Sequence, residues 1–335
     1  MGRELETRQE VARMFSGART VAAGALFCLL VLFAGPVQAQ DAAPAPPLVD
    51  ETWLAQNAKR ADVVLLDLRP KDAYLRGHLA GAVFADYPER WRPVGKSGRR
   101  GLMRREAFAA LAGEKGIGSD SHVILIHGGR NAVDAATAAD LYLSFRIQGH
   151  PRVSILNAPL RAAADAGVGV EQGEPAPRPA QTFAATATTG FLAGGMKAVR
   201  EAIGQKPLID MRRDAEFIGL DKAADVAEPG TVPTARNLPN RWVFDETTGR
   251  FRDPETLRRV FALARVPLNE RVIFFGNNTA LGALGWFVAR ELLGNQEARV
   301  YAAGMGEWMA GDPTENPRIV RLTQASPEVA PVKRR

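Results

Sequence analysis

Two short segments of the chain combine residue types that could hold an anion or a reacting group. The first segment occupies positions 127–131 and reads His127-Gly128-Gly129-Arg130-Asn131. Its two glycines let consecutive amides converge, its arginine offers a two-pronged donor to an oxyanion, and its imidazole adds a further donor. These five residues are therefore our candidates for an anion-binding site.

The second segment contains only neutral side chains. It reads Gly276-Asn277-Asn278-Thr279, so it would offer an anion little beyond its backbone amides. The asparagine pair is typical of a turn with positive φ. We therefore expect anion affinity to reside in the first segment, with Arg130 as the main donor. Protonation of His127, at an ordinary pKa of about 6.5, should then strengthen binding as the pH falls.

The cysteine content excludes most thiol chemistry. Cysteine occurs once, at position 28, so a disulfide framework, a cysteine zinc site, an iron–sulfur cluster and a CxxC redox pair are all excluded. The histidines at 78, 122 and 150 show no metal-ligand spacing around His127. We expect neither a metal nor a cofactor.

The elements that must position these segments occur twice, at an offset of about 150 residues. The apolar runs 63–67 and 207–210 each end in an Asp-x-Arg motif, as expected of buried parallel strands. The β-branched and aromatic runs 123–126 and 272–275 each lead into one of the two loops and then into a long helical stretch. Strands that alternate with helices predict two α/β domains with mainly parallel sheets.

The repeated motifs resemble those of the rhodanese, or thiosulfate sulfurtransferase, family. In the first half they are Asp67-x-Arg69, then Gly77-His78-Leu79-x-Gly81-Ala82; in the second, Asp210-x-Arg212, then Gly230-Thr231-Val232-Pro233-x-Ala235, and finally Val300 to Trp308. The resemblance covers roughly 49–162 and 196–315. It implies two domains, each a parallel sheet of about five strands wrapped by helices.

The resemblance also implies a chemistry that this chain departs from. Rhodaneses carry sulfur as a persulfide on the cysteine that opens the loop after the central strand. His127 and Gly276 stand at the two corresponding positions, so neither loop offers a catalytic nucleophile of the family type. The alternative to an anion-binding role for residues 127–131 is that this loop is a relic of the family's active site, with an empty or sulfate-filled pocket.

The remaining motif residues are expected to be structural. We interpret the two Asp-x-Arg pairs as ion pairs, His78 as a packing and hydrogen-bonding residue, and Trp286 and Trp308 as core. The helix over 280–293 has leucines at helical spacing and stops at Gly294.

The N-terminus predicts export. Residues 21–33 form an apolar stretch too short for a membrane span of about 20 residues, and Val37-Gln38-Ala39 fits a cleavage site. The competing interpretation is a membrane anchor, and initiation at Met14 is an open alternative. We therefore divide the chain into a signal peptide (1–39), a Pro/Ala-rich segment (40–48), the first domain (49–164), a linker (165–195), the second domain (196–316) and a tail (317–335).

These observations favour a periplasmic or secreted rhodanese-like pseudoenzyme without a stable membrane anchor. It would bind a small oxyanion, a sulfur-containing anion or a periplasmic partner protein. The alternative is a transferase or hydrolase that works by a non-cysteine route through His127. The net charge of +6 is scattered, and Lys/Arg residues are not interleaved with aromatics, so nucleic-acid binding is not expected.

We predict that the exported protein begins at Gln40. The apolar stretch and the small residues before it match a site read by signal peptidase. N-terminal sequencing of the protein recovered from the producing cells checks this prediction, which a mature N-terminus before residue 30 would contradict.

Overall fold

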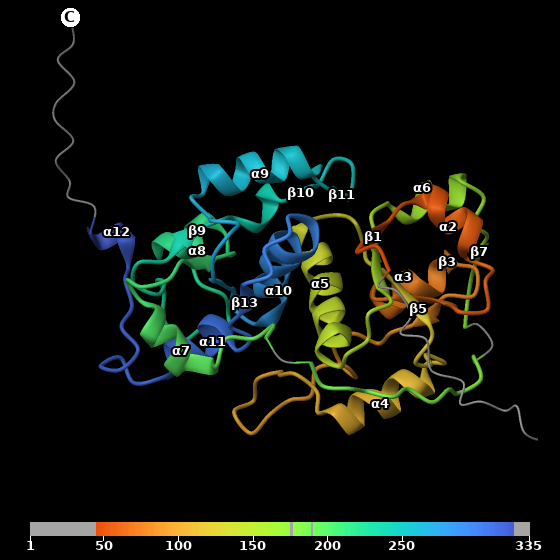
Figure 1. Cartoon of the computed structure of the whole chain (residues 1–335), viewed down its shortest axis with the longest axis horizontal. Helices are drawn as coiled ribbons and strands as arrows, with labels where there is room; N and C mark the ends of the chain where they lie inside the picture. Colours follow the sequence, from red (N-terminus) through yellow and green to blue (C-terminus); the bar gives the residue numbers. More distant parts are fainter. Residues whose placement is uncertain (1–44, 175–176, 189, 325–335) are drawn as a thin grey trace, which may run out of the picture. The chain divides into compact units, whose positions relative to one another are not determined.

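The computed structural model describes residues 45–174, 177–188 and 190–324, which belong to one compact unit (Figure 1). The expected signal peptide and residues 325–335 of the expected tail lie outside the described residues. Among the described residues, the helices are all too short or too polar to cross a membrane.

The first domain is built on a five-stranded, fully parallel sheet with the order β1-β6-β5-β2-β4. All residues of β2 and β5 are buried, because helices cover both faces of the sheet. The strands are β1 (Leu48–Val49), β2 (Val63–Asp67), β4 (Val83–Phe84), β5 (His122–Ile126) and β6 (Val153–Leu156). The helices are α2 (Glu51–Asn57), α3 (Lys71–Arg76), α4 (Arg105–Glu114), α5 (Ala132–Ile147) and α6 (Leu160–Asp165).

The second domain repeats this design on a four-stranded parallel sheet with the order β13-β12-β8-β9. A single parallel bridge from Leu192 to Val300 extends its edge. The strands are β8 (Leu208–Asp210), β9 (Arg236–Asn237), β12 (Val272–Phe275) and β13 (Ala298–Val300). The helices are α7 (Gly195–Ala202), α8 (Asp214–Ile218), α9 (Pro254–Leu263), α10 (Thr279–Phe287) and α11 (Gly304–Ala310), with α12 (Arg321–Gln324) after them. The predicted pair of parallel α/β domains is confirmed.

Each Asp-x-Arg motif forms the same ion pair at the end of its strand. Arg69 Nη2 lies 2.6 Å from Asp67 Oδ2 and also donates to the Gly77 carbonyl. Arg212 Nη2 lies 2.6 Å from Asp210 Oδ2 and donates to the Gly230 carbonyl. Each arginine thus ties the end of a strand to the glycine of the next motif, which confirms the structural interpretation.

The other expected structural residues are also buried. Trp286 and Trp308 are fully buried in the core, and the buried His78 ring stacks on Tyr74 with ring centroids 3.9 Å apart. The helix expected over 280–293 starts one residue earlier, and its last part is the π-helix η2 (Val288–Leu292). It ends before Gly294, whose φ of 87° continues the chain in the left-handed region.

Part of the predicted linker is packed onto the first domain. Strand β7 (Val170–Glu171) pairs with β3 (His78–Leu79), and Phe183 is buried beside Phe108. The Gln181 amide also donates to the Gly113 carbonyl. The low apolar content of this segment concealed these contacts, because one aromatic side chain and backbone hydrogen bonds are enough to fix an extended segment.

Helices α5 and α10, which follow the two loops, lie side by side between the two sheets (Figure 1). The Tyr142 ring meets the Phe287 ring edge-on at 4.8 Å between centroids, and its hydroxyl donates to Glu291 Oε2 at 3.0 Å. The domains therefore share one apolar core cluster across this helix pair.

We predict that Arg212→Met lowers the free energy of unfolding by about 3–5 kcal/mol, because it leaves the buried Asp210 carboxylate without its countercharge. Arg76→Met, which removes one partner of an exposed i,i+4 ion pair, should leave the stability essentially unchanged. Urea denaturation of the two variants and the wild type tests this. Equal stability of the two variants would contradict it.

Candidate functional site

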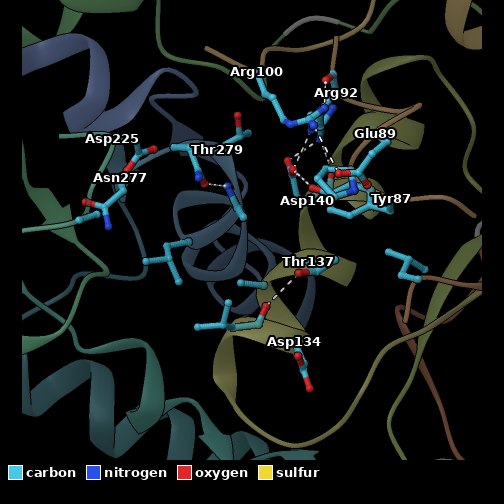
Figure 2. Close-up of a pocket in the computed structure, with 18 of the residues that line it drawn as sticks. Tyr87, Glu89, Arg92, Arg100, Asp134, Thr137, Asp140, Asp225, Asn277 and Thr279 are labelled. Carbon is cyan, nitrogen blue, oxygen red and sulfur yellow. Dashed lines mark hydrogen bonds and ion pairs between the residues drawn. The ribbon is translucent and has the colours of Figure 1, made fainter. Parts of the chain in front are cut away.

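The two loops line a single groove with a volume of about 1690 Å³. We call residues 127–131 the first loop, residues 276–279 the second loop, and this cavity the groove. Figure 2 shows Asn277 and Thr279 on one side and Arg92, Asp140 and Tyr87 on the other. The groove thus brings together the two predicted segments, which lie about 150 residues apart in the sequence.

Both loops are positioned by the same strand–loop–helix arrangement. The first leaves β5 and the second leaves β12, at the carboxyl ends of parallel strands where ligands bind in such sheets. Asn131 caps α5 by accepting from the Val133 and Asp134 amides, and Asn278 caps α10 by accepting from the Ala280 amide. The expected positive φ of the asparagine pair is wrong, because Asn278 has a φ of −138° and acts as a helix cap.

The first loop encloses an anionic group of the same chain, the carboxylate of Asp134. Asp134 Oδ2 accepts from the Arg130 amide and from Arg130 Nε, at 3.1 Å in each case. A β-carbon at Gly128 would collide with the same carboxylate oxygen. The Arg130 side chain itself is 72% exposed. Two donors expected to bind an external anion, the Arg130 amide and Arg130 Nε, are therefore engaged by an internal carboxylate.

His127 differs from its expected state, because its ring is buried. Burial lowers its pKa to about 4, against smaller opposing effects of the Asp134 charge and the Leu156 backbone. The Gly129 amide donates to Nδ1, so in the neutral ring the proton is on Nε2, which is buried and has no hydrogen-bond partner among the described residues. The expectation that His127 becomes protonated between pH 7.5 and 5.5 is wrong.

The second loop is closed at the position of the family nucleophile. A β-carbon on residue 276 would lie only 2.5 Å from Leu281 Cβ. The Gly276 and Asn277 carbonyls accept from the Met305 and Gly306 amides, which ties this loop to the start of α11. A side chain at position 276 would therefore require α10 to move.

Two polar groups of the groove were missed by the sequence analysis. Glu216, which is 4% exposed, accepts from Asn277 Nδ2 at 2.8 Å and pairs with Arg213. Asp140 binds Arg92 and the Tyr87 hydroxyl, and Arg92 is itself only 3% exposed. The partners of Glu216 and Asp140 lie far away in the sequence or belong to no motif. The spacing of residues in the sequence could therefore not indicate these contacts. Among the described residues, no cluster of His, Cys, Asp and Glu could hold a metal ion.

The family assignment follows from the fold, the loop positions and the comparison with known proteins. The model of the rhodanese-like domain matches residues 50–162 and again residues 190–311. The chain therefore belongs to the rhodanese-like family and carries two such domains.

The chain aligns with curated relatives over most of their length. The chain is 31% identical over 280 residues to a Saccharopolyspora erythraea protein named "Putative thiosulfate sulfurtransferase", with 81% of this chain and 96% of that protein covered. It is 25% identical to the thiosulfate sulfurtransferase of Cricetulus griseus, with 81% and 88% covered.

Solved structures share the fold. The 3-mercaptopyruvate sulfotransferase SseA of Escherichia coli aligns with a TM-score of 0.64 at 22% identity, covering 78% of this chain and 99% of that one. The Tum1 protein of Saccharomyces cerevisiae aligns with a TM-score of 0.68 at 15% identity, covering 82% and 99%. At these identities the likeness concerns the fold alone.

We predict that the protein loses stability as the pH falls from about 6.5 towards 4. Burial lowers the pKa values of His122, His127 and His150 to about 4 in the folded protein, so the unfolded chain takes up protons first. Denaturation curves at several pH values test this. His127→Gln should show a shallower loss than the wild type because one proton uptake is removed, and an unchanged slope would contradict the buried, neutral state of His127.

Proposed function

We propose that this protein is a non-catalytic member of the rhodanese-like family that binds a ligand or partner in the groove between its domains. The observation that carries the proposal is the second loop, where Gly276 replaces a nucleophile and Leu281 fills the space beside it. A persulfide needs a thiolate at this place, because sulfur can be carried only on an acceptor that forms a covalent bond to it.

The first loop supports the same proposal. His127 stands where the family nucleophile would, and its ring is 3% exposed and has a pKa lowered by burial. The single cysteine of the chain, Cys28, lies in the segment that we expect to be removed on export. We propose a periplasmic or secreted location on the same basis as the signal-peptide prediction.

The large groove supports a binding role. Small-molecule sites commonly occupy about 300–1,000 Å³, and this groove exceeds that range. It is lined by both domains, so a ligand in it would contact both. A small organic anion or a segment of a periplasmic protein fits this size better than an inorganic ion alone.

The alternative is an enzyme that uses His127 as a base without cysteine. A general base needs a free nitrogen within hydrogen-bond reach of the proton it removes. In His127 one nitrogen accepts from the Gly129 amide and the other is buried. This geometry favours the binding role over the catalytic one.

We predict no thiosulfate:cyanide sulfurtransferase activity in the purified protein that begins at Gln40, because residues 40–335 contain no cysteine. Thiocyanate release, measured against a heat-inactivated control, tests this. Turnover well above that control would overturn the proposal.

We also predict that Gly276→Cys alone restores little or no persulfide formation, since its β-carbon would meet Leu281. Gly276→Cys combined with Leu281→Gly, which removes the obstructing β-carbon of residue 281, should accept sulfur from thiosulfate to a greater extent. Mass spectrometry of both variants in the form that begins at Gln40, with Leu281→Gly as the thiol-free control, checks this. A persulfide of equal extent in the single and double variants would show that Leu281 does not close the loop.

A further inference from the structure

Within residues 45–174, 177–188 and 190–324, one arginine of the groove has no neighbouring carboxylate to neutralise its charge. Among the described residues, every other arginine or lysine lining the groove has a carboxylate oxygen within ion-pair distance, as Arg130 has Asp134 and Arg213 has Glu216. Arg99 has none in the part of the chain that the structure describes. Its Nε is moreover buried and makes no hydrogen bond there.

A hairpin of the first domain carries Arg99 across to the second loop. Val94 and Arg100 form an antiparallel bridge, and the Gly95 amide donates to the Arg99 carbonyl at 2.8 Å. Gly98 closes the turn with a φ of 74°, a left-handed conformation that suits glycine. The hairpin, residues 93–101, therefore holds Arg99 by backbone hydrogen bonds rather than by an ion pair.

The side chain of Arg99 ends beside the backbone of the second loop. A β-carbon on Gly306 would lie 3.3 Å from Arg99 Nε, so the missing side chain at 306 leaves room for the guanidinium. The Gly306 amide in turn donates to the Asn277 carbonyl at 2.9 Å. Arg99 is thus a first-domain residue placed at the second-domain loop.

The carboxylates nearest to this end of the groove are engaged elsewhere. Glu307 accepts from the Tyr301 hydroxyl at 2.7 Å, and Glu216 accepts from Asn277 and pairs with Arg213. Asp225 lines the groove as an exposed residue, and no ion pair joins it to Arg99 among the described residues. The Arg99 guanidinium therefore remains available to an anion from solution.

The two loops consequently differ in the charge that the opposite domain brings to them. The hairpin of β10 (Phe244–Asp245) and β11 (Arg250–Phe251) places the Glu246 carboxylate at the Ala132 amide, next to the first loop. Together with Asp134, Glu246 makes the first loop unfavourable for a further anion. The second loop instead receives a cation.

We propose that Arg99 is the anion-binding group of the groove and holds the carboxylate or sulfur-oxyanion head group of a small organic molecule. This inference rests on the proposed function of the groove as a binding site, and it moves the anion from the first loop to the second. Val94 and Leu281 line the groove as well, and they offer apolar contacts to the body of such a molecule. A planar guanidinium suits either head group because it can donate two parallel hydrogen bonds.

Calorimetric titration at low salt tests the proposal, with thiosulfate as the inorganic probe and phenylacetate as the organic one. Arg99→Gln should weaken the binding of phenylacetate about ten- to a hundredfold, because a charge-assisted hydrogen bond is lost. Arg99→Lys should recover part of the affinity, since it keeps the charge but not the paired donors. Phenylacetamide, which lacks the charge, should bind the wild type weakly.

The matched control is Lys96→Gln, which removes one positive charge from the same hairpin at an exposed residue that does not line the groove. It should bind both probes as the wild type does. Equal weakening by Lys96→Gln and Arg99→Gln would overturn the proposal in favour of a general charge effect. Thermal unfolding of each variant verifies that the fold is intact.

The remaining outcomes also decide the question. Tight thiosulfate binding with no affinity for phenylacetate would overturn the organic-ligand part and leave an inorganic anion. Absence of binding of both probes to the wild type, or unchanged binding by Arg99→Gln, would overturn the site at Arg99. Because titration without cyanide detects binding alone, these results are independent of the turnover assay that tests the lack of catalysis.

Discussion

The packing of α5 against α10 is the constraint on which the site depends. Each helix starts at the loop that follows the central strand of its domain, so joining the helices brings both loops to one groove. The contact is well determined because Tyr142 both packs on Phe287 and hydrogen-bonds to Glu291. α5 is rich in buried alanine, and Gly285 of α10 lies so close to Phe274 that a β-carbon would collide with it. Small residues thus permit close packing on both the helix pair and the sheet behind it.

The two domains use one scaffold for different local chemistry. The Asp-x-Arg pairs are nearly superimposable in their contacts, down to the glycine carbonyl that each arginine binds. They differ at the next position, where Thr231 donates to Asp210 and His78 instead hydrogen-bonds to the Tyr74 carbonyl. The loops diverge further: one encloses its own Asp134, and the other is filled by Leu281. The scaffold is thus the same in both domains, while the groups that its two loops enclose differ.

Each domain extends a hairpin to the loop of the other domain, and the two hairpins bring opposite charges to the two ends of the groove. One hairpin brings Glu246 to the first loop, and the other brings Arg99 to the second. Neither loop therefore has an electrostatic environment set by its own residues alone.

The sequence by itself determined the two α/β domains, the structural ion pairs and the absence of the family's cysteine at positions 127 and 276. These follow from apolar runs, repeated short motifs and residue identity, all of which are local properties of the chain. The tertiary structure alone decided that Arg130 is engaged by Asp134 and that His127 is neutral, although Arg130 and Asp134 are only four residues apart. It also decided that Arg99, which belongs to no motif, faces the second loop. Burial and cross-domain contacts set these properties, and neither can be read from the residue types in a single segment.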